Sequence, residues 1–546
     1  MAKIHKLEKS AQYYYDKAVE YTNKGDYVQS LDYLYRAYSL DDSDKKYELF
    51  IEMGACYALL GEHNSALKSY YKALAFDSKN EQTFVGIISS LIAKNQNPEA
   101  VYYINYSNAK NIIGEDYDVK VSNNTDKFKV VGKYDREAVI FVARKLMKNG
   151  EFEYAKSILE KIPEQSKDYI EALNLIAMIN LSQEKYIQSA LICDNVLAKE
   201  ENNVYALTSK IVALHYLKNY EERDNLVEKL DNVCVKSEKD VKKVAICMQQ
   251  IKNTELTLKY YQKLFEFNPY DKNTNLILAL LYHNNGKTSL AHTILVKLSK
   301  LYPDCEIIKF YAVELMQNKD RQYEVIVDIP SDIQEQRFNY INEKLTQLKT
   351  VERLINYCKK NEEFLGLLRW ILWSPQVKIA GHIAKFLAQN KYFHPLLRQL
   401  LVDPDVNYLP KRECLATLLK YAQKKNFALF MQTVVQFFAP RQPKLKVDER
   451  IDYAYWEVYS LCVFLLEDNF DKSLNSTYKQ FAKNCEFLIN SGVDVDENSL
   501  SVLLANKLQG HPLFADTKYL CKLLDCDANK FNKNLENYNN LEIKND

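Results

Sequence analysis

A repeat of 34 residues constrains this chain more than any other feature of its sequence. Five blocks follow one another without a gap, and they start at Arg136, Ile170, Val204, Glu238 and Lys272. The last block shows the recurring residue types at positions 8, 11, 15, 20 and 32, which are Ala279, Tyr282, Gly286, Ala291 and Pro303. A fixed period of this length, with small and aromatic residues at set offsets, indicates an array of helix–turn–helix units. Such arrays stack into extended surfaces, so the period favours a protein that holds other molecules.

The blocks resemble the tetratricopeptide repeat (TPR) family. Further residues that carry the resemblance are Ala18, Gly25, Ala37, Gly54, Gly61, Ala66, Ala143, Gly150, Ala155 and Ala177. Small residues fit where the two helices of a pair cross closely, and a glycine ends the first helix in a left-handed conformation. The resemblance covers residues 11 to about 320. It implies antiparallel helix pairs that stack into a right-handed superhelix.

The period also divides the chain, and we predict an all-α fold of two parts. Three TPR-like repeats over residues 11–114 are followed by an insert or flap over 115–135, where apolar and polar residues alternate. Five repeats and a capping helix fill residues 136–320. The β-branched run from Val325 to Ile329, closed by Pro330, is interpreted as the joint to a second α-helical domain. That domain comprises a basic region over 331–446 and an acidic region over 447–546.

Composition supports helices and a cytoplasmic location. Gly and Pro number only 12 each in 546 residues, and both are commoner in an average globular chain. The first residues, MAKIHKLEKSAQYYY, contain no apolar core segment, and no run of 18 apolar residues occurs. We therefore expect neither a secretory leader nor a membrane span. Eleven cysteines are scattered without a CxxC pair, which is typical of reduced cysteines in a cytoplasmic protein.

Charge is unevenly distributed in the second half. Residues 341–446 carry 18 Lys and Arg against 7 Asp and Glu, and residues 447–546 carry 10 against 17. Two segments of the basic region, 374–387 and 403–419, each place a proline turn before a helix with a small residue, and they resemble HEAT repeats. We assign a basic patch to Lys411, Arg412, Lys424 and Lys425. A surplus of this kind favours an acidic protein surface or nucleic acid as partner, and the alternative is a solvated outer face.

The end of the chain predicts a short helical hairpin. Residues Thr517 to Leu535 would form two helices joined by a turn over Asp525 to Asp527. The residues expected to face inward are Cys521, Leu524, Cys526, Phe531 and Leu535. This unit resembles a DNA-binding helix-turn-helix, although Asp525 stands where that motif usually has glycine. A hairpin packed on a core would give the same pattern.

Sequence motifs for catalysis are absent. Phosphate-loop, dinucleotide-binding and HExxH patterns do not occur, and no two of the 8 histidines share a helix face at metal spacing. We predict no enzymatic activity, no cofactor and no metal.

The TPR resemblance also implies a ligand groove lined by the first helix of each pair. The matching residues are Ile51, Ala55, Ala58 and Leu59 in the block from Tyr47, and Leu276, Leu280, His283 and Asn284 in the last block. Their apolar character favours an extended segment or an amphipathic helix as ligand. The alternative is that they pack against a neighbouring helix. The Lys and Asn that hold a terminal carboxylate in chaperone-docking members are replaced by Tyr15, Val19 and Ala55, which disfavours docking to a chaperone tail.

These observations predict a non-catalytic scaffold that binds one or more proteins in the concave groove of its repeats, in the cytoplasm and without a membrane. The alternative is a nucleic-acid-binding regulator that uses the basic region 341–446 or the C-terminal hairpin. Retention on DNA or RNA that falls steeply with salt would distinguish the two classes.

Overall fold

The computed structural model describes residues 10–41, 46–113, 139–148, 150–233, 235–374, 376–421, 426–431, 433–465, 470–508 and 512–545. These residues are almost entirely helical, with one pair of short strands, so the all-α prediction is confirmed. They divide between two compact units. One comprises residues 1–347 and 363–370, and the other comprises 348–362 and 371–546. The predicted insert at 115–135 lies outside the described residues.

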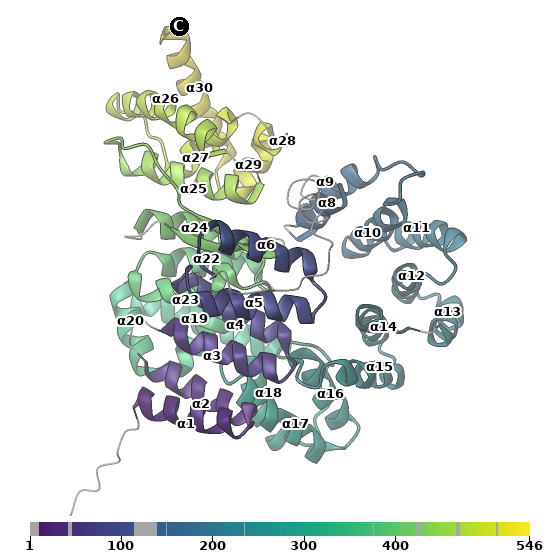
Figure 1. Cartoon of the computed structure of the whole chain (residues 1–546). Helices are drawn as coiled ribbons and strands as arrows, with labels where there is room; N and C mark the ends of the chain where they lie inside the picture. Colours follow the sequence, from purple (N-terminus) through teal and green to yellow (C-terminus); the bar gives the residue numbers. More distant parts are fainter. Residues whose placement is uncertain are drawn as a thin grey trace, which may run out of the picture. The chain divides into compact units, whose positions relative to one another are not determined.

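The first unit is built from helix pairs. Its N-terminal run contains α1 (Ala11–Asn23), α2 (Tyr27–Leu40), α3 (Lys46–Leu59), α4 (His63–Phe76), α5 (Glu81–Ala93) and α6 (Asn97–Ala109). Its second run contains α8 (Val139–Lys148), α9 (Phe152–Leu159), α10 (Tyr169–Ser182), α11 (Tyr186–Lys199), α12 (Val204–Tyr216), α13 (Tyr220–Asn232), α14 (Glu238–Gln250), α15 (Thr254–Phe267), α16 (Lys272–Asn284), α17 (Thr288–Leu301) and α18 (Glu306–Gln317). Consecutive helices pack against each other as hairpins (Figure 1).

Local sequence sets where these helices begin. Asn80, Asn203, Ser237 and Asp271 each stand directly before a block, and each side chain accepts a hydrogen bond from the backbone N–H three residues on. Such a cap satisfies one of the backbone donors that the first turn leaves without a partner. The same register therefore carries a start signal in several blocks.

The turn inside each pair requires a left-handed residue. Gly25, Gly61, Gly150 and Gly286 have φ between 75° and 79°, as the glycine pattern predicts, and each lies between the helices of its pair. Blocks without the glycine keep the conformation, with φ values of 56° to 61° at Asn95, Glu184, Lys218 and Lys252. The turn geometry is therefore retained where its preferred residue is lost, at the steric cost that a side chain carries in this region.

The first helices pack directly on the last repeat. The Tyr57 hydroxyl of α3 donates a hydrogen bond to the Leu301 carbonyl at the end of α17, and the Tyr57 and Tyr302 rings stack at 5.8 Å between centres. The Asn268 amide donates to the Glu62 carboxylate at 3.3 Å. We call this contact between α2–α4 and residues 268–302 the seam. It joins residues more than 200 positions apart in the sequence.

The elements after α18 belong mostly to the second unit. These are α19 (Ser331–Leu348), α20 (Val351–Lys360), α21 (Glu362–Leu372), α22 (Val377–Ala388), the 3₁₀ turn η1 (Lys391–Phe393), α23 (His394–Val402), α24 (Tyr408–Tyr421), α25 (Glu449–Leu465), α26 (Phe470–Asn490), α27 (Glu497–Lys507), α28 (Pro512–Ala515), α29 (Thr517–Leu523) and α30 (Ala528–Asn545). All but the last residue of α19, and residues 363–370 of α21, belong to the first unit. Strands β1 (Phe427–Met431) and β2 (Val434–Phe438) form an antiparallel pair, which the sequence analysis did not anticipate. The domain boundaries predicted within 331–546 stay predictions.

Among the described residues, no helix is both long enough and apolar enough to cross a lipid bilayer.

Candidate functional site

The structure separates the predicted groove residues into two groups. Leu276 and Leu280 of α16 are 1% and 0% exposed, so they belong to the core and no ligand can reach them. Ile51 of α3 is buried as well, and its neighbours Ala55 and Ala58 are half-buried. The prediction that Leu276, Leu280 and Ile51 line an open groove is wrong, because neighbouring helices cover them.

Three predicted groove residues differ from these. Leu59 is exposed, and His283 and Asn284 make polar contacts with another segment of the chain. Leu59, at the end of α3, is 58% exposed. His283 and Asn284 of α16 contact residues 321–323 of the same chain. This part of the groove is therefore occupied by the protein itself.

Two of the four side chains assigned to the basic patch are buried. Lys411 and Arg412 of α24 are 3% and 1% exposed. The Lys411 ammonium donates to the Asp403 carbonyl at 2.7 Å, and the Arg412 guanidinium donates to the Leu523 carbonyl at 3.0 Å and pairs with Glu413 and Glu457. Lys411 is buried against backbone carbonyls and Arg412 against two carboxylates, so the patch prediction is wrong for them. Lys424 and Lys425 lie outside the described residues.

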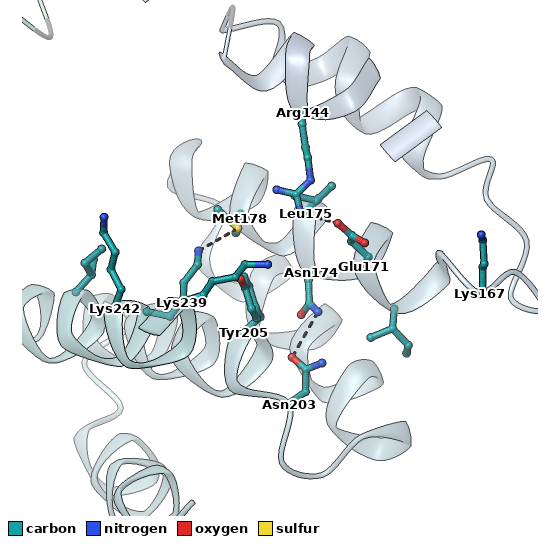
Figure 2. Close-up of a pocket in the computed structure, with 13 residues that line it drawn as sticks. Arg144, Lys167, Glu171, Asn174, Leu175, Met178, Asn203, Tyr205, Lys239 and Lys242 are labelled. Atoms are coloured by element: carbon teal, nitrogen blue, oxygen red, sulfur yellow. Dashed lines mark hydrogen bonds and ion pairs between the residues drawn. The ribbon is translucent and has the colours of Figure 1, made fainter. Parts of the chain in front are cut away.

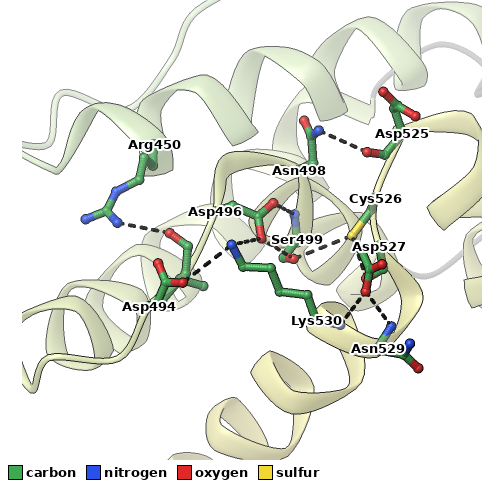
Figure 3. Close-up of polar contacts among 11 residues, drawn as sticks. Arg450, Asp494, Asp496, Asn498, Ser499, Asp525, Cys526, Asp527, Asn529 and Lys530 are labelled. Carbon is green, nitrogen blue, oxygen red and sulfur yellow. Dashed lines mark hydrogen bonds and ion pairs between the residues drawn. The ribbon is translucent and has the colours of Figure 1, made fainter.

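The C-terminal hairpin folds as predicted, and its turn is held by polar contacts. Helix α29 ends at Leu523, Asp525 takes a left-handed φ of 51°, and α30 starts at Ala528. Figure 3 shows the Lys530 ammonium reaching two carboxylates, Asp494 at 3.5 Å and Asp496 at 3.4 Å. Lys530 is the first cation of α30, and here it is paired within the protein.

A pocket of about 550 Å³ lies among the first helices of four successive pairs, α8, α10, α12 and α14. The cations that line it are Arg144, Lys167, Lys239, Lys242 and Lys243, and the one carboxylate is Glu171. The Glu171 carboxylate pairs with the Arg144 guanidinium at 2.5 Å. The pocket therefore keeps a surplus of positive charge (Figure 2).

The 34-residue register explains why these side chains meet. Position 9 of the block from Arg136 is Arg144. Positions 5 and 9 are Asn174 and Met178 in the block from Ile170, and Lys242 and Ile246 in the block from Glu238. These are the offsets at which the sequence analysis placed groove residues in two other blocks. The same rule applied to the intermediate blocks would have found these five lining residues, of which Arg144 and Lys242 are cations, but not Lys167, Lys239 or Lys243.

Two buried polar atoms of the pocket have no hydrogen-bond partner within the part of the chain that the structure describes. The Asn174 amide donates weakly to the Asn203 side-chain oxygen at 3.4 Å, which leaves the buried Asn174 Oδ1 without a donor among the described residues. The Tyr205 hydroxyl likewise lacks one. Buried polar atoms are costly when unsatisfied. The pocket thus presents hydrogen-bonding capacity that a bound polar group can use.

Like charges crowd the deepest lysine. The Lys239 and Lys243 ammonium nitrogens lie 5.2 and 4.8 Å from the centre of the Tyr205 ring, and Lys243 Nζ is 3.8 Å from the Met178 sulfur. Burial lowers the pKa of Lys243, and the positive charges of Arg144 and Lys239 lower that pKa further. An anion placed among these groups would relieve the repulsion.

No family model matches this chain, and no curated protein matches it. Among solved structures it is similar to a tetratricopeptide repeat protein from Parabacteroides merdae, at 14% identity and a TM-score of 0.24, over 54% of this chain and 99% of that chain. It is also similar to yeast Tom70, at 11% identity and a TM-score of 0.21, over 94% and 95% of the two chains. It is similar as well to a structure of the APC/C hetero-tetramer Cut9–Hcn1, at 14% identity and a TM-score of 0.25, over 94% of this chain and 83% of that chain.

Similarities at these scores say nothing about function. The repeat architecture is instead shown by the helix pairs themselves. Helices α10, α12, α14 and α16 begin at residues 169, 204, 238 and 272. Each is followed by a left-handed turn and a second helix. Residues 139–317 form an array of helix pairs that repeats about every 34 residues, the arrangement that the resemblance implies.

Proposed function

We propose that this chain is a non-catalytic protein-interaction scaffold of the cytoplasm, and that it binds an extended acidic segment of a partner protein in the pocket of α8, α10, α12 and α14. The surplus of cations beside Asn174, whose buried Oδ1 has no donor among the described residues, is the observation that carries this proposal. A carboxamide can pair with both the N–H and the C=O of an extended backbone. The ammonium groups would recognise carboxylates or phosphate groups along that backbone.

The chemistry of the lining favours a polypeptide over a nucleic acid. Ile170, Leu175, Met178 and Ile246 add apolar surface between the cations, which suits alternate side chains of an extended segment. The aromatic contribution is Tyr205 alone, and both nearby lysines lie over its ring. Single-strand binders instead use several rings as stacking platforms.

The decisive experiment measures binding of labelled decapeptides to the full chain by fluorescence anisotropy. We expect a Glu/Asp-rich peptide to bind, and a peptide with Gln and Asn at the same positions to bind at least tenfold more weakly. Affinity should fall as salt rises from 50 to 300 mM, because exposed charges are screened. Equal affinity for both peptides would contradict the proposal.

Charge reversal locates the site. Lys242→Glu should weaken the acidic peptide by roughly 5–30-fold, since one attraction becomes a repulsion of about 1–2 kcal/mol in total. Lys252→Glu is the matched control, because Lys252 is exposed in the turn after α14 and does not line the pocket. Asn174→Asp should weaken the acidic peptide without changing side-chain size. A single-stranded oligonucleotide that binds more tightly than the peptide, with the same Lys242 dependence, would favour nucleic acid instead.

A further inference from the structure

An extended segment of the chain lies on the inner helices of the last repeats. Residues 321–329 follow α18, form neither helix nor strand, and contact α14, α16 and α18. We call these residues the strap. The sequence analysis interpreted part of this stretch as a joint between domains. Its contacts are those of a ligand.

Side chains of the repeats recognise the backbone of the strap. The Asn284 amide donates to the Tyr323 carbonyl at 2.7 Å, and its oxygen accepts from the Tyr323 N–H at 3.0 Å. The His283 ring nitrogen Nε2 lies 3.0 Å from the Arg321 carbonyl. The Gln249 amide donates to the Val325 carbonyl at 2.5 Å. These hydrogen bonds are made to backbone N–H and C=O groups, so they recognise an extended main chain whatever side chains it carries.

Selectivity comes from one buried aromatic side chain. Tyr323 is 4% exposed, and its ring lies between His283 and Tyr311, at 5.4 and 5.8 Å between centres. Its hydroxyl donates to the Glu314 carboxylate at 2.9 Å. Two residues later, Val325 packs against the apolar core of α12–α16, whereas Glu324 between them is exposed. The face therefore fits a tyrosine and a valine spaced by one outward residue.

The strap is held as a bound peptide is held. Glu324 is exposed, Val325 and Ile326 are half-buried, and Ile329 at the far end is buried. The bonds from the repeats to the strap's main chain come from side chains, not from a sheet. His283 and Asn284 are positions 12 and 13 of their block, which the sequence analysis assigned to the groove. The strap therefore occupies the part of the groove that His283 and Asn284 line.

We propose that the face of α14, α16 and α18 is a peptide-binding site whose resident ligand is the strap, and that an extended peptide with the strap's Tyr-x-Val pattern can replace the strap in trans. This site is separate from the basic pocket, and the proposal does not depend on the acidic-peptide function. The two sites share α14, whose first half contributes lysines to the pocket and whose last turn contributes Gln249 to the strap.

The test uses a labelled synthetic peptide of residues 320–330 and the full chain. Wild-type protein, with its strap in place, should bind the peptide weakly. Tyr323→Ala removes the anchor of the resident strap, so the peptide should bind this variant at least tenfold more tightly. Asn284→Ala added to Tyr323→Ala should abolish that gain, because the same carboxamide holds either ligand. A peptide with Tyr323→Ala is the matched negative probe.

Folding and local opening are checked independently of binding. Far-UV circular dichroism should show unchanged helicity in Tyr323→Ala, and Val325→Ser is a milder variant for the same purpose. In Asn284→Ala alone, hydrogen exchange at the Tyr323 amide should accelerate by roughly 5–30-fold, because the substitution removes the side chain that pairs with both the Tyr323 N–H and the Tyr323 carbonyl. A folded Tyr323→Ala protein that does not bind the peptide would overturn the proposal. So would loss of helicity in both strap variants, since the strap would then be part of the core.

Discussion

One tyrosine passes between two helices where only glycine leaves room. The ring of Tyr70 in α4 is 4% exposed and faces Gly54 of α3 and Gly86 of α5. A Cβ added at Gly54 would lie 2.5, 2.7 and 2.8 Å from three atoms of the Tyr70 ring, and one added at Gly86 would lie closer still. Atoms do not approach so closely without displacement, and a buried ring has little freedom to move.

The two opposing effects of Gly54→Ala can be compared. Inside an ordinary helix, alanine is favoured over glycine by about 0.8–1 kcal/mol. Overpacking a tight core typically costs about 1–3 kcal/mol, and contacts with a rigid ring below 3 Å place this site in the upper part of that range. We therefore expect Gly54→Ala to destabilise the protein by a net amount of about 1–2 kcal/mol, measured by urea unfolding followed by far-UV circular dichroism.

The sign should reverse when the ring is removed. In a Tyr70→Ala background, Gly54→Ala should stabilise by about 1 kcal/mol, because helix propensity then acts without a clash. Gly381→Ala serves as a control. Its added Cβ would lie 3.0 Å from the Glu413 Cγ, a contact that a shift of a few tenths of an ångström relieves, so the loss of stability should be smaller than at Gly54. If Gly54→Ala stabilises the wild-type protein, the packing argument is refuted.

Four further predictions concern single side chains. Lys243→Met should increase the free energy of unfolding by about 0.5–2 kcal/mol and should weaken binding of the acidic peptide. The folded chain lowers the pKa of this lysine below its ordinary value of 10.5, so the protonated side chain costs stability at neutral pH. A pH series should show the gain disappearing as the pH rises through 10.5. Ala291→Trp should lower the urea midpoint, because Ala291 is fully buried in α17 and overpacking costs about 1–3 kcal/mol; an unchanged curve would show that this site tolerates bulk. Leu276→Glu should cost several kcal/mol and reduce helicity, since it would bury a charge, and a soluble variant with unchanged helicity would contradict its core assignment. Tyr57→Phe should cost about 1–2 kcal/mol in the same unfolding assay, because the Leu301 carbonyl loses its donor, and an unaltered midpoint would show that the seam bond contributes nothing.

Sequence periodicity predicted the features that depend on local chemistry. Gly61, Gly150 and Gly286 occupy left-handed turns because no other residue adopts that conformation without steric cost. Ala291 is buried because its block position lies where two helices cross. These properties belong to one hairpin and recur in several copies, so a single sequence reveals them.

Features that depend on distant residues were not predictable in this way. Arg412 occurs in a stretch with surplus positive charge, yet its partners include Glu457 and the Leu523 carbonyl, 45 and 111 residues away in sequence. The strap was interpreted from its β-branched residues alone, and its main partners lie 38 to 76 residues upstream. The basic pocket is an intermediate case. The groove offsets reach Arg144 and Lys242, whereas Lys167, Lys239 and Lys243 lie at block positions that the groove rule does not include.

The seam imposes an order of events on synthesis of the protein. The Tyr57 hydroxyl meets the Leu301 carbonyl across 244 residues, which take a ribosome roughly 12–50 s at about 5–20 residues per second. During that interval α2–α4 have emerged, but the surface that will receive α17 stays open to solvent. Folding of the first repeats is therefore completed by the last ones, and the nascent chain exposes Tyr57 and its surroundings to solvent before it can bury them.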